Sequence, residues 1–172
     1  MENIQPLEIT DKQIVLELRT NKDNIATNII LGLSVFAFLM PLPAAAYFIS
    51  SDIGLGLSFF IVCIVLWISG GFLGRLGLWN KYGKEVFIIE KKLFVHYNDY
   101  RYFKDSYKEK EYNEIGIFEA FDMREQEGNS VASMSVLLDD ELVATSHQKI
   151  PVSMIKEIAA AAAKINRHAW QV

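Results

Sequence analysis

The sequence has 172 residues, of which 51% are hydrophobic and 22% are charged, so apolar and charged residues must be segregated along the chain. A net charge of −4 provides no general basic field and argues against nucleic acid as a partner. The single cysteine, Cys63, excludes an intrachain disulfide and a cysteine-based zinc site, and its apolar neighbours favour an ordinary buried thiol. No basic segment followed by an apolar one begins the sequence, so no cleavable signal peptide is predicted.

Two short strands are predicted before the first long apolar segment. Apolar and polar residues alternate over residues 7–9 and 14–18, on either side of a polar stretch at 10–13. A lone β-hairpin is only marginally stable in water. We therefore expect residues 1–22 to form a cytoplasmic β segment that packs on the C-terminal part of the chain.

Two uncharged segments follow, and each is long enough to cross a membrane. Residues 24–51 and 53–74 contain 28 and 22 residues without a charge. A bilayer core needs about 20 apolar residues in a helix. The sequence therefore predicts a membrane helical hairpin over residues 23–76, with spans at about 25–49 and 53–73.

The composition of these spans favours an anchor. Pro41 and Pro43 predict a kink or early break in the first span, and Gly70 and Gly74 suit close packing of the second span against the first or against a partner helix. Neither span contains an ionisable residue of the kind that marks ion paths and proton relays. A gated discontinuity at the prolines remains open as an alternative.

Basic residues predict the orientation of the hairpin. The linker at 50–52 has none, whereas eight flank the outer ends of the spans: Lys12, Arg19, Lys22, Arg75, Lys81, Lys84, Lys91 and Lys92. Because positive residues stay on the cytoplasmic side, both termini are expected in the cytoplasm. The expected membrane-interface residues are Arg19, Lys22, Arg75, Trp79, Lys81, Tyr82 and Lys84, with Gly83 permitting a sharp change of direction from helix to strand.

The remaining residues, 79–170, predict a small α+β domain. Strands are expected at 86–89, 93–97, 100–112, 115–118, 133–138 and 142–145, with a charged loop at 122–129. Apolar residues then recur at three-to-four spacing from Pro151 to about His168, which predicts an amphipathic helix with Pro151 in its first turn. One helix covering a curved antiparallel sheet satisfies the burial of its apolar face.

Few residues predict chemistry. His96, His147 and His168 lie in different predicted elements without metal-ligand spacing, and the phosphate-loop and nucleophile-elbow motifs are absent from the sequence. Asp139-Asp140-Glu141 could bind a cation, but a charged turn is the simpler interpretation. No catalytic, metal or cofactor site is therefore expected, and the protein is expected not to be an enzyme.

Residues 96–112 are the most distinctive part of the predicted domain, because tyrosines alternate there with basic residues. This pattern suits a protein contact or anionic lipid headgroups, although one aromatic face in the core and one charged face in water is the simpler alternative. The candidate contact residues are Tyr100, Arg101, Tyr102, Lys104, Tyr107 and Lys108.

A two-span hairpin, the stretch Trp79-Asn80-x-x-Gly83-Lys84-Glu85, meandering strands and a final helix together resemble bacterial membrane-anchored proteins with a PH-like domain. The resemblance covers residues 7 to about 168 and implies a curved sheet capped by a helix. It places the chain in the bacterial inner membrane. We expect an accessory or scaffold protein that binds another membrane protein or itself; lipid-headgroup sensing and a small transport or channel component are the alternatives.

Overall fold

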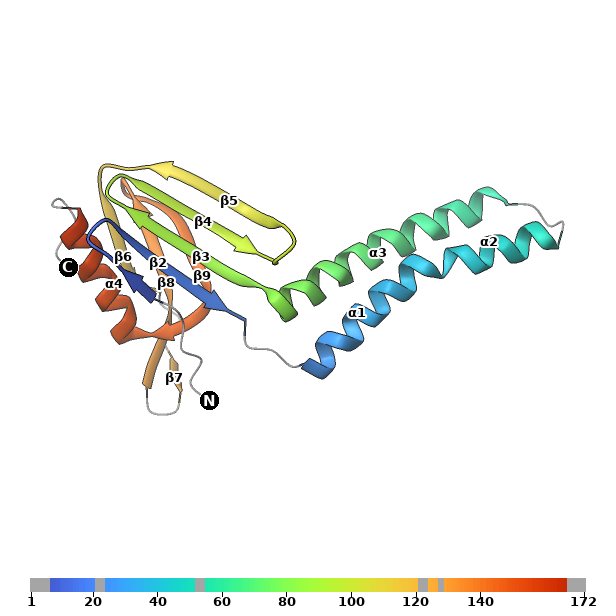
Figure 1. The fold of residues 1–172 in the computed structure, drawn as a ribbon, viewed down its shortest axis with the longest axis horizontal. Helices are drawn as coiled ribbons and strands as arrows, with labels where there is room; N and C mark the ends of the chain where they lie inside the picture. Colours follow the sequence, from blue (N-terminus) through green and yellow to red (C-terminus); the bar gives the residue numbers. More distant parts are fainter. Residues whose placement is uncertain (1–6, 21–23, 52–54, 121–123, 127–128, 167–172) are drawn as a thin grey trace. The chain divides into compact units, whose positions relative to one another are not determined.

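The computed structural model describes residues 7–20, 24–51, 55–120, 124–126 and 129–166 (Figure 1). The chain divides into two compact units. Residues 20–83 form the helical unit, and residues 1–19 and 84–172 together form the β unit. The β unit is therefore assembled from both ends of the sequence. The helical unit is one continuous insertion between these two parts of the β unit.

The helical unit contains α1 (Asn24–Leu39), α2 (Pro41–Ser50) and α3 (Leu57–Tyr82). The run Ile25–Ser50 and helix α3 are each 26 residues long and are long and apolar enough to cross a membrane, by length and composition. Helix α3 continues well past residue 73, where the second span was expected to end. That expectation treated Arg75 as a limit, but a charged residue does not end a helix once the chain has left the hydrocarbon.

The predicted break in the first span is confirmed at Met40, which separates α1 from α2. The N–H of Met40 still donates to the carbonyl of Phe36 at 2.8 Å. Pro41 then has no N–H for the next bond of the helical ladder, and its ring crowds the preceding turn. A new helix begins at Pro41, in the first-turn position that proline tolerates.

Glycines bring α1 and α3 together in antiparallel fashion. The hydroxyl of Ser34 donates to the carbonyl of Gly70 at 2.8 Å. A Cβ added to Gly74 would lie 2.8 Å from the Ser34 Oγ, and one added to Gly77 would lie 2.6 Å from the Leu31 side chain. The small residues of α3 therefore pack against the first span, as interfaces between membrane helices commonly do.

A five-stranded antiparallel sheet forms one layer of the β unit. Its strands, in order, are β1 (Leu7–Ile9), β2 (Gln13–Arg19), β3 (Lys84–Glu90), β4 (Leu93–Asp99) and β5 (Lys104–Glu111). Strand β2 pairs with β3 along its whole length, with Gln13 opposite Glu90 and Arg19 opposite Lys84. The strand expected at 100–112 begins only at Lys104, because residues 100–103 form a turn.

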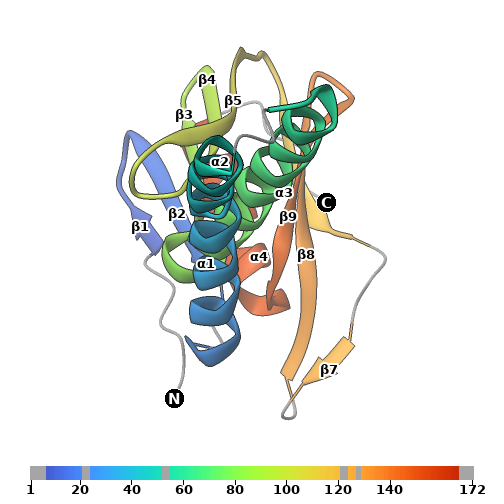
Figure 2. The same cartoon turned by 90° about the vertical axis from the view of Figure 1, so that its right-hand side faces the viewer.

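The second sheet contains β6 (Ile115–Glu119), β7 (Arg124–Gln126), β8 (Asn129–Leu138) and β9 (Glu141–Pro151). Figure 2 shows β8 beside β9, with the short β7 at one end of β8. The charged loop expected at 122–129 therefore includes a strand; Arg124 and Glu125 are exposed there, and edge strands tolerate such charges. Asp139 and Asp140 have φ angles of 48° and 66°, which suit the two-residue turn between β8 and β9.

Helix α4 (Val152–Ile165) begins one residue after Pro151 and contacts β2 of the first sheet and β6, β8 and β9 of the second. Its buried residues Ile155, Ile158 and Ala162 join a core that includes Phe87, Phe94, Met134 and Leu138. The β unit is thus an α+β structure of antiparallel strands covered by one terminal helix.

Candidate functional site

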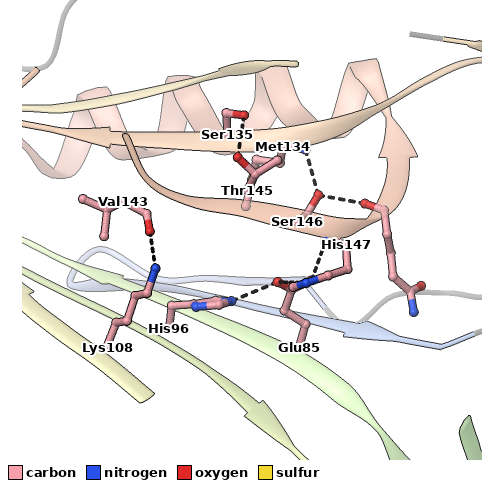
Figure 3. Close-up of polar contacts among 10 residues, drawn as sticks. Glu85, His96, Lys108, Met134, Ser135, Val143, Thr145, Ser146 and His147 are labelled. Carbon is pink, nitrogen blue, oxygen red and sulfur yellow. Dashed lines mark hydrogen bonds and ion pairs between the residues drawn. The ribbon is translucent and has the colours of Figure 1, made fainter. Parts of the chain in front are cut away.

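Glu85 is fully buried in the β unit, on the same side of β3 as Phe87 and Ile89. Its Oε1 lies 2.9 Å from Nε2 of His96 on β4 and 3.1 Å from Nδ1 of His147 on β9 (Figure 3). Its Oε2 accepts the backbone N–H of His147 at 3.0 Å. One buried carboxylate therefore joins the two sheets.

A bulge in β9 presents His147 to this carboxylate. Ser133 lies opposite Lys149 and Ser135 lies opposite Thr145, so residues 146–148 of β9 face a single residue of β8. The Ser146 hydroxyl replaces the interrupted ladder by accepting the N–H of Met134 at 2.8 Å and donating to the carbonyl of Gln148 at 2.7 Å (Figure 3). Bulges commonly redirect a side chain. Here the bulge directs both the ring and the backbone N–H of His147 toward Glu85.

A second side chain from the five-stranded sheet also bonds to β9. Lys108 on β5 donates from Nζ to the carbonyl of Val143 at 2.8 Å (Figure 3). Within the described ranges β9 pairs with β8 alone, so its other edge presents backbone groups without a neighbouring strand. Lys108 binds the carbonyl of Val143 on that edge, and Glu85 binds the N–H of His147. These bonds protect the edge of β9 from pairing with another chain.

The cluster of Glu85, His96 and His147 supplies an orienting carboxylate and an imidazole whose side chain is 67% exposed. Catalytic histidines are often held in this way, but they also need a nucleophile or a metal nearby. The described residues give His147 no hydrogen-bond partner other than Glu85, and they contain no group of three acidic, histidine or cysteine residues suited to a metal. What the geometry supports is a polar clamp between sheets.

The sequence alone does not reveal this cluster, because its histidines lie in separate predicted elements. The structure brings His96 and His147 together, whereas His168 lies outside the described residues. One signal was available: Glu85 occupies a core-facing position in the alternation of β3, next to Phe87 on the same side. A buried carboxylate needs hydrogen-bonding partners.

The acidic turn considered for a cation is held by bonds within the protein. Asp139 Oδ1 accepts the N–H groups of Asn113 and Glu114, both at 3.0 Å. The Glu141 carboxylate accepts a hydrogen bond from Lys110, which lowers the pKa of Glu141. Two of the three acids are thus engaged with groups of the β unit, which matches the interpretation as a charged turn.

The candidate contact residues separate into three groups. The first group is Lys104 and Tyr107, which together with the neighbouring Tyr97 form the outward side of β4 and β5, here called the tyrosine face. The rings of Tyr97 and Tyr107 stack with centroids 6.1 Å apart, and Lys104 Nζ lies 4.2 Å from the Tyr97 centroid. Tyr107 is 56% exposed, and its hydroxyl donates to Glu109, which raises the pKa of Tyr107.

The second group lies in the turn between β4 and β5, residues 100–103, here called the aromatic turn. Tyr100 donates its N–H to the carbonyl of Phe103 at 3.0 Å, and their rings stack with centroids 4.5 Å apart. Asp99 Oδ1 accepts the N–H of Arg101, whose φ angle is 74°. Tyr102 and Phe103 are 67% and 43% exposed, whereas Tyr100 is buried. The third group is Lys108 alone, which faces β9.

The expected membrane-interface residues lie in both units. Arg75, Trp79, Lys81 and Tyr82 occupy the last turns of α3, and Lys81 Nζ donates to Asn28 Oδ1 of α1 at 3.3 Å. Arg19 ends β2, and Lys22 lies outside the described residues. Lys84 begins β3, where its ammonium lies 2.8 Å from Glu17 and 3.7 Å from Asp99. The hydrogen bond to Glu17 raises the pKa of Lys84.

Gly83 is the single residue between α3 and β3, and its importance is steric. Its φ of −59° is open to any residue, so the change of direction from helix to strand does not depend on a positive φ. A Cβ at Gly83 would instead lie 2.3 Å from the carbonyl oxygen of Trp79. Thr20, the first residue of the helical unit, binds the end of α3. Its hydroxyl donates to the carbonyls of Trp79 and Gly83 at 3.1 and 3.0 Å.

A crevice of about 490 Å³ lies in the helical unit, beside the break at Pro41. Its lining is mainly apolar and includes Met40, Phe48, Phe59 and Cys63. Such a lining offers no charged group to an ion or a polar substrate. The crevice therefore gives the transport alternative no support.

The sequence matches no model of a known protein family, and it matches no curated protein. No matched family therefore supplies roles for Glu85, His96 and His147.

Proposed function

We propose that this protein is a non-enzymatic accessory or scaffold protein of the bacterial inner membrane, whose β unit is a PH-like domain that binds another membrane protein. The main support for this proposal is the helical insertion between β2 and β3. Two runs of 26 residues that are apolar enough to cross a membrane separate two strands that pair along their whole length. Such an insertion attaches the domain at two adjacent points, with both termini on the cytoplasmic side.

The PH-like character is supported by the arrangement of the elements within the β unit. Strands β2 to β5 belong to one antiparallel sheet, β6, β8 and β9 to a second, and α4 follows the last strand and contacts both sheets. In this interpretation the helical unit occupies the connection between the first two strands of the domain. The remaining strands, β1 and β7, are short additions at the sheets.

The tyrosine face is the surface that we assign to the partner. Tyr107 is exposed, and stacking on Tyr97 restricts its ring before any partner binds. Tyrosine provides a large contact area with few rotatable bonds, so ordering it costs little free energy on binding. Lys104 adds a cation beside the rings, which favours a partner surface that carries carboxylates.

Photo-crosslinking in native membranes tests this assignment. A benzophenone amino acid at Tyr107 is expected to form a discrete adduct, and the same group at Leu142 is not, although Leu142 is 58% exposed on the same unit. Lys104→Glu should reduce the Tyr107 adduct at least several-fold, because it reverses the charge beside the rings. Equal adducts at both positions, or none at Tyr107, would contradict a partner on the tyrosine face.

A further inference from the structure

The aromatic turn lies at the end of the sheet where the chain passes to and from the helical unit. Lys84, the first residue of β3, is opposite both Arg19 at the end of β2 and Asp99 at the end of β4. Neighbouring strands are about 4.8 Å apart and each residue advances about 3.3 Å. The turn that follows Asp99 therefore begins within about 10 Å of both points at which the chain leaves the β unit.

Helix α3 is longer than the hydrocarbon core of a bilayer is thick. Its 26 residues extend about 39 Å at about 1.5 Å per residue. The hydrocarbon core is about 30 Å thick and each headgroup layer adds about 5 to 8 Å. A spanning α3 is thus about as long as the core and one whole headgroup layer together, and Gly83 alone then separates it from β3.

The chemistry of the turn matches that layer. Tyr102 and Phe103 expose aromatic rings and Arg101 exposes a cation, a combination that is enriched where membranes meet water. In the described part of the β unit, the remaining exposed large hydrophobic residues are Ile9, Tyr107 and Leu142.

The turn is also held in shape before any contact is made. Arg101 adopts a left-handed backbone conformation that glycine would adopt at lower cost, and Asp99 stabilises it by accepting its N–H. Stacking on buried Tyr100 restricts the Phe103 ring. Contacts within the β unit therefore order the aromatic turn.

We propose that the aromatic turn is a membrane-contact element, with Tyr102 and Phe103 in the headgroup layer and Arg101 at the lipid phosphates. This inference rests on the proposed membrane anchoring. It adds a non-covalent contact with the bilayer to the two points at which the chain connects the β unit to the helical unit. The occupant is the bilayer that the protein's own helices span. A soluble anionic ligand is the competing occupant.

Depth-dependent quenching in the full chain tests the contact. In a Cys63→Ala background, single cysteines replace Tyr102, Lys92 or Val65 and carry an environment-sensitive fluorophore. Lys92 is the matched control, because it is exposed in the β3–β4 turn at the opposite end of the same strands. Val65, which is 57% exposed on α3, reports membrane insertion. The vesicles contain phosphatidylcholine and phosphatidylglycerol with spin-labelled lipids.

The expected result is quenching of the Tyr102 label by headgroup-level spin labels at least three-fold stronger than that of the Lys92 label, with the Val65 label quenched by mid-chain spin labels. Quenching at Val65 with equal, weak quenching at Tyr102 and Lys92 would overturn the inference and leave the anchoring intact. An unquenched Val65 label would overturn both. If inorganic phosphate changed the fluorescence of the label at position 102, and spin-labelled lipids did not quench that label, the turn would be assigned to a soluble anion instead.

Discussion

The two units differ in the side chains that they expose. The helical unit exposes large apolar residues such as Leu57, at 79%, and Ile68, at 68%, while Thr27 and Ser34 are buried. The β unit buries Phe87 and Phe94 completely and exposes charged residues. Soluble proteins rarely expose contiguous apolar surfaces as large as that of the helical unit. The exposed surfaces of the two units therefore differ in polarity.

The two units also use polar groups differently. Between α1 and α3 a buried polar contact is local, because a serine hydroxyl bonds to the glycine carbonyl that faces it. In the β unit a buried carboxylate on β3 is shared by groups from two other strands, β4 and β9. Loss of a polar residue should therefore have the larger effect in the β unit, and loss of a small residue should have the larger effect within the helical unit.

Glu85→Ala should be the most destabilising of the changes considered. It leaves the His147 N–H and the buried His96 ring without their acceptor and removes the link between the sheets. We expect a loss of about 3 kcal/mol in the free energy of unfolding of the β unit. Hydrogen exchange of the β3 and β9 amides in the full chain measures it. Glu157→Ala on the exposed side of α4 is the control, and an equal, small effect of the two changes would contradict the clamp.

Gly74→Ile should destabilise the helical unit by about 2 kcal/mol, because the new side chain overlaps the Ser34 hydroxyl at the contact with α1. Gly71→Ile is the matched control, since a Cβ at Gly71 would meet nothing closer than 4.0 Å. Unfolding in mixed detergent micelles, followed by the fluorescence of Trp67 and Trp79, reports the difference. If Gly71→Ile were the more damaging change, the described contact of α1 with α3 would be wrong.

Tyr112→Phe should cost about 1 kcal/mol at neutral pH, because the Tyr112 hydroxyl donates to the carbonyl of Glu90 and accepts from Asn166 Nδ2. Burial raises the pKa of Tyr112 to about 12 from its ordinary value of 10.0. The folded state therefore holds the proton more tightly, so this contribution is fully present below pH 10 and is lost as the pH rises toward 12.

The stability difference between the wild type and Tyr112→Phe isolates this effect from other groups that titrate at high pH. It should be constant from pH 7 to 9 and narrow between pH 10 and 12, as read by hydrogen exchange or denaturant unfolding. A difference that widens above pH 10 would show that the buried phenol favours ionisation.

Lys110→Ala should have the smallest effect. Its partner Glu141 is exposed, and exposed ion pairs contribute little to stability. We expect no measurable change in Tm, together with a return of the Glu141 pKa from its lowered position toward the ordinary range. Titration of the Glu141 carboxyl carbon by NMR checks this, and an unchanged pKa would show that Lys110 is not its main partner.

Local patterns predicted those elements whose cause is local. Alternation over residues 14–18 identified β2, and Pro41 identified the break in the first span, because each depends on neighbouring residues. The clamp depends on residues from β3, β4 and β9, and on a bulge at 146–148 that leaves no mark in the alternation. Sequence proximity could not reveal it, although the core-facing position of Glu85 was a signal.

The boundary between the units shows a second kind of difference. Residues 79–82 were assigned to the soluble domain but belong to α3. Charge marks where a helix leaves hydrocarbon, whereas hydrogen bonding and sterics decide where the helix ends. Here it ends at Tyr82, and the N–H of the following Gly83 still donates to the carbonyl of Trp79 at 2.8 Å.

We propose that one folded β unit is interrupted by a separate helical unit that resides in the membrane. Replacing residues 20–83 with Asn-Gly joins Arg19 to Lys84, which are already opposite each other in neighbouring strands. Membrane fractionation compares this shortened chain with the full chain. We predict that the full chain resists alkaline extraction from membranes, whereas the shortened chain is soluble and unfolds cooperatively. Alkaline release of the full chain, or an unfolded shortened chain, would contradict the claim.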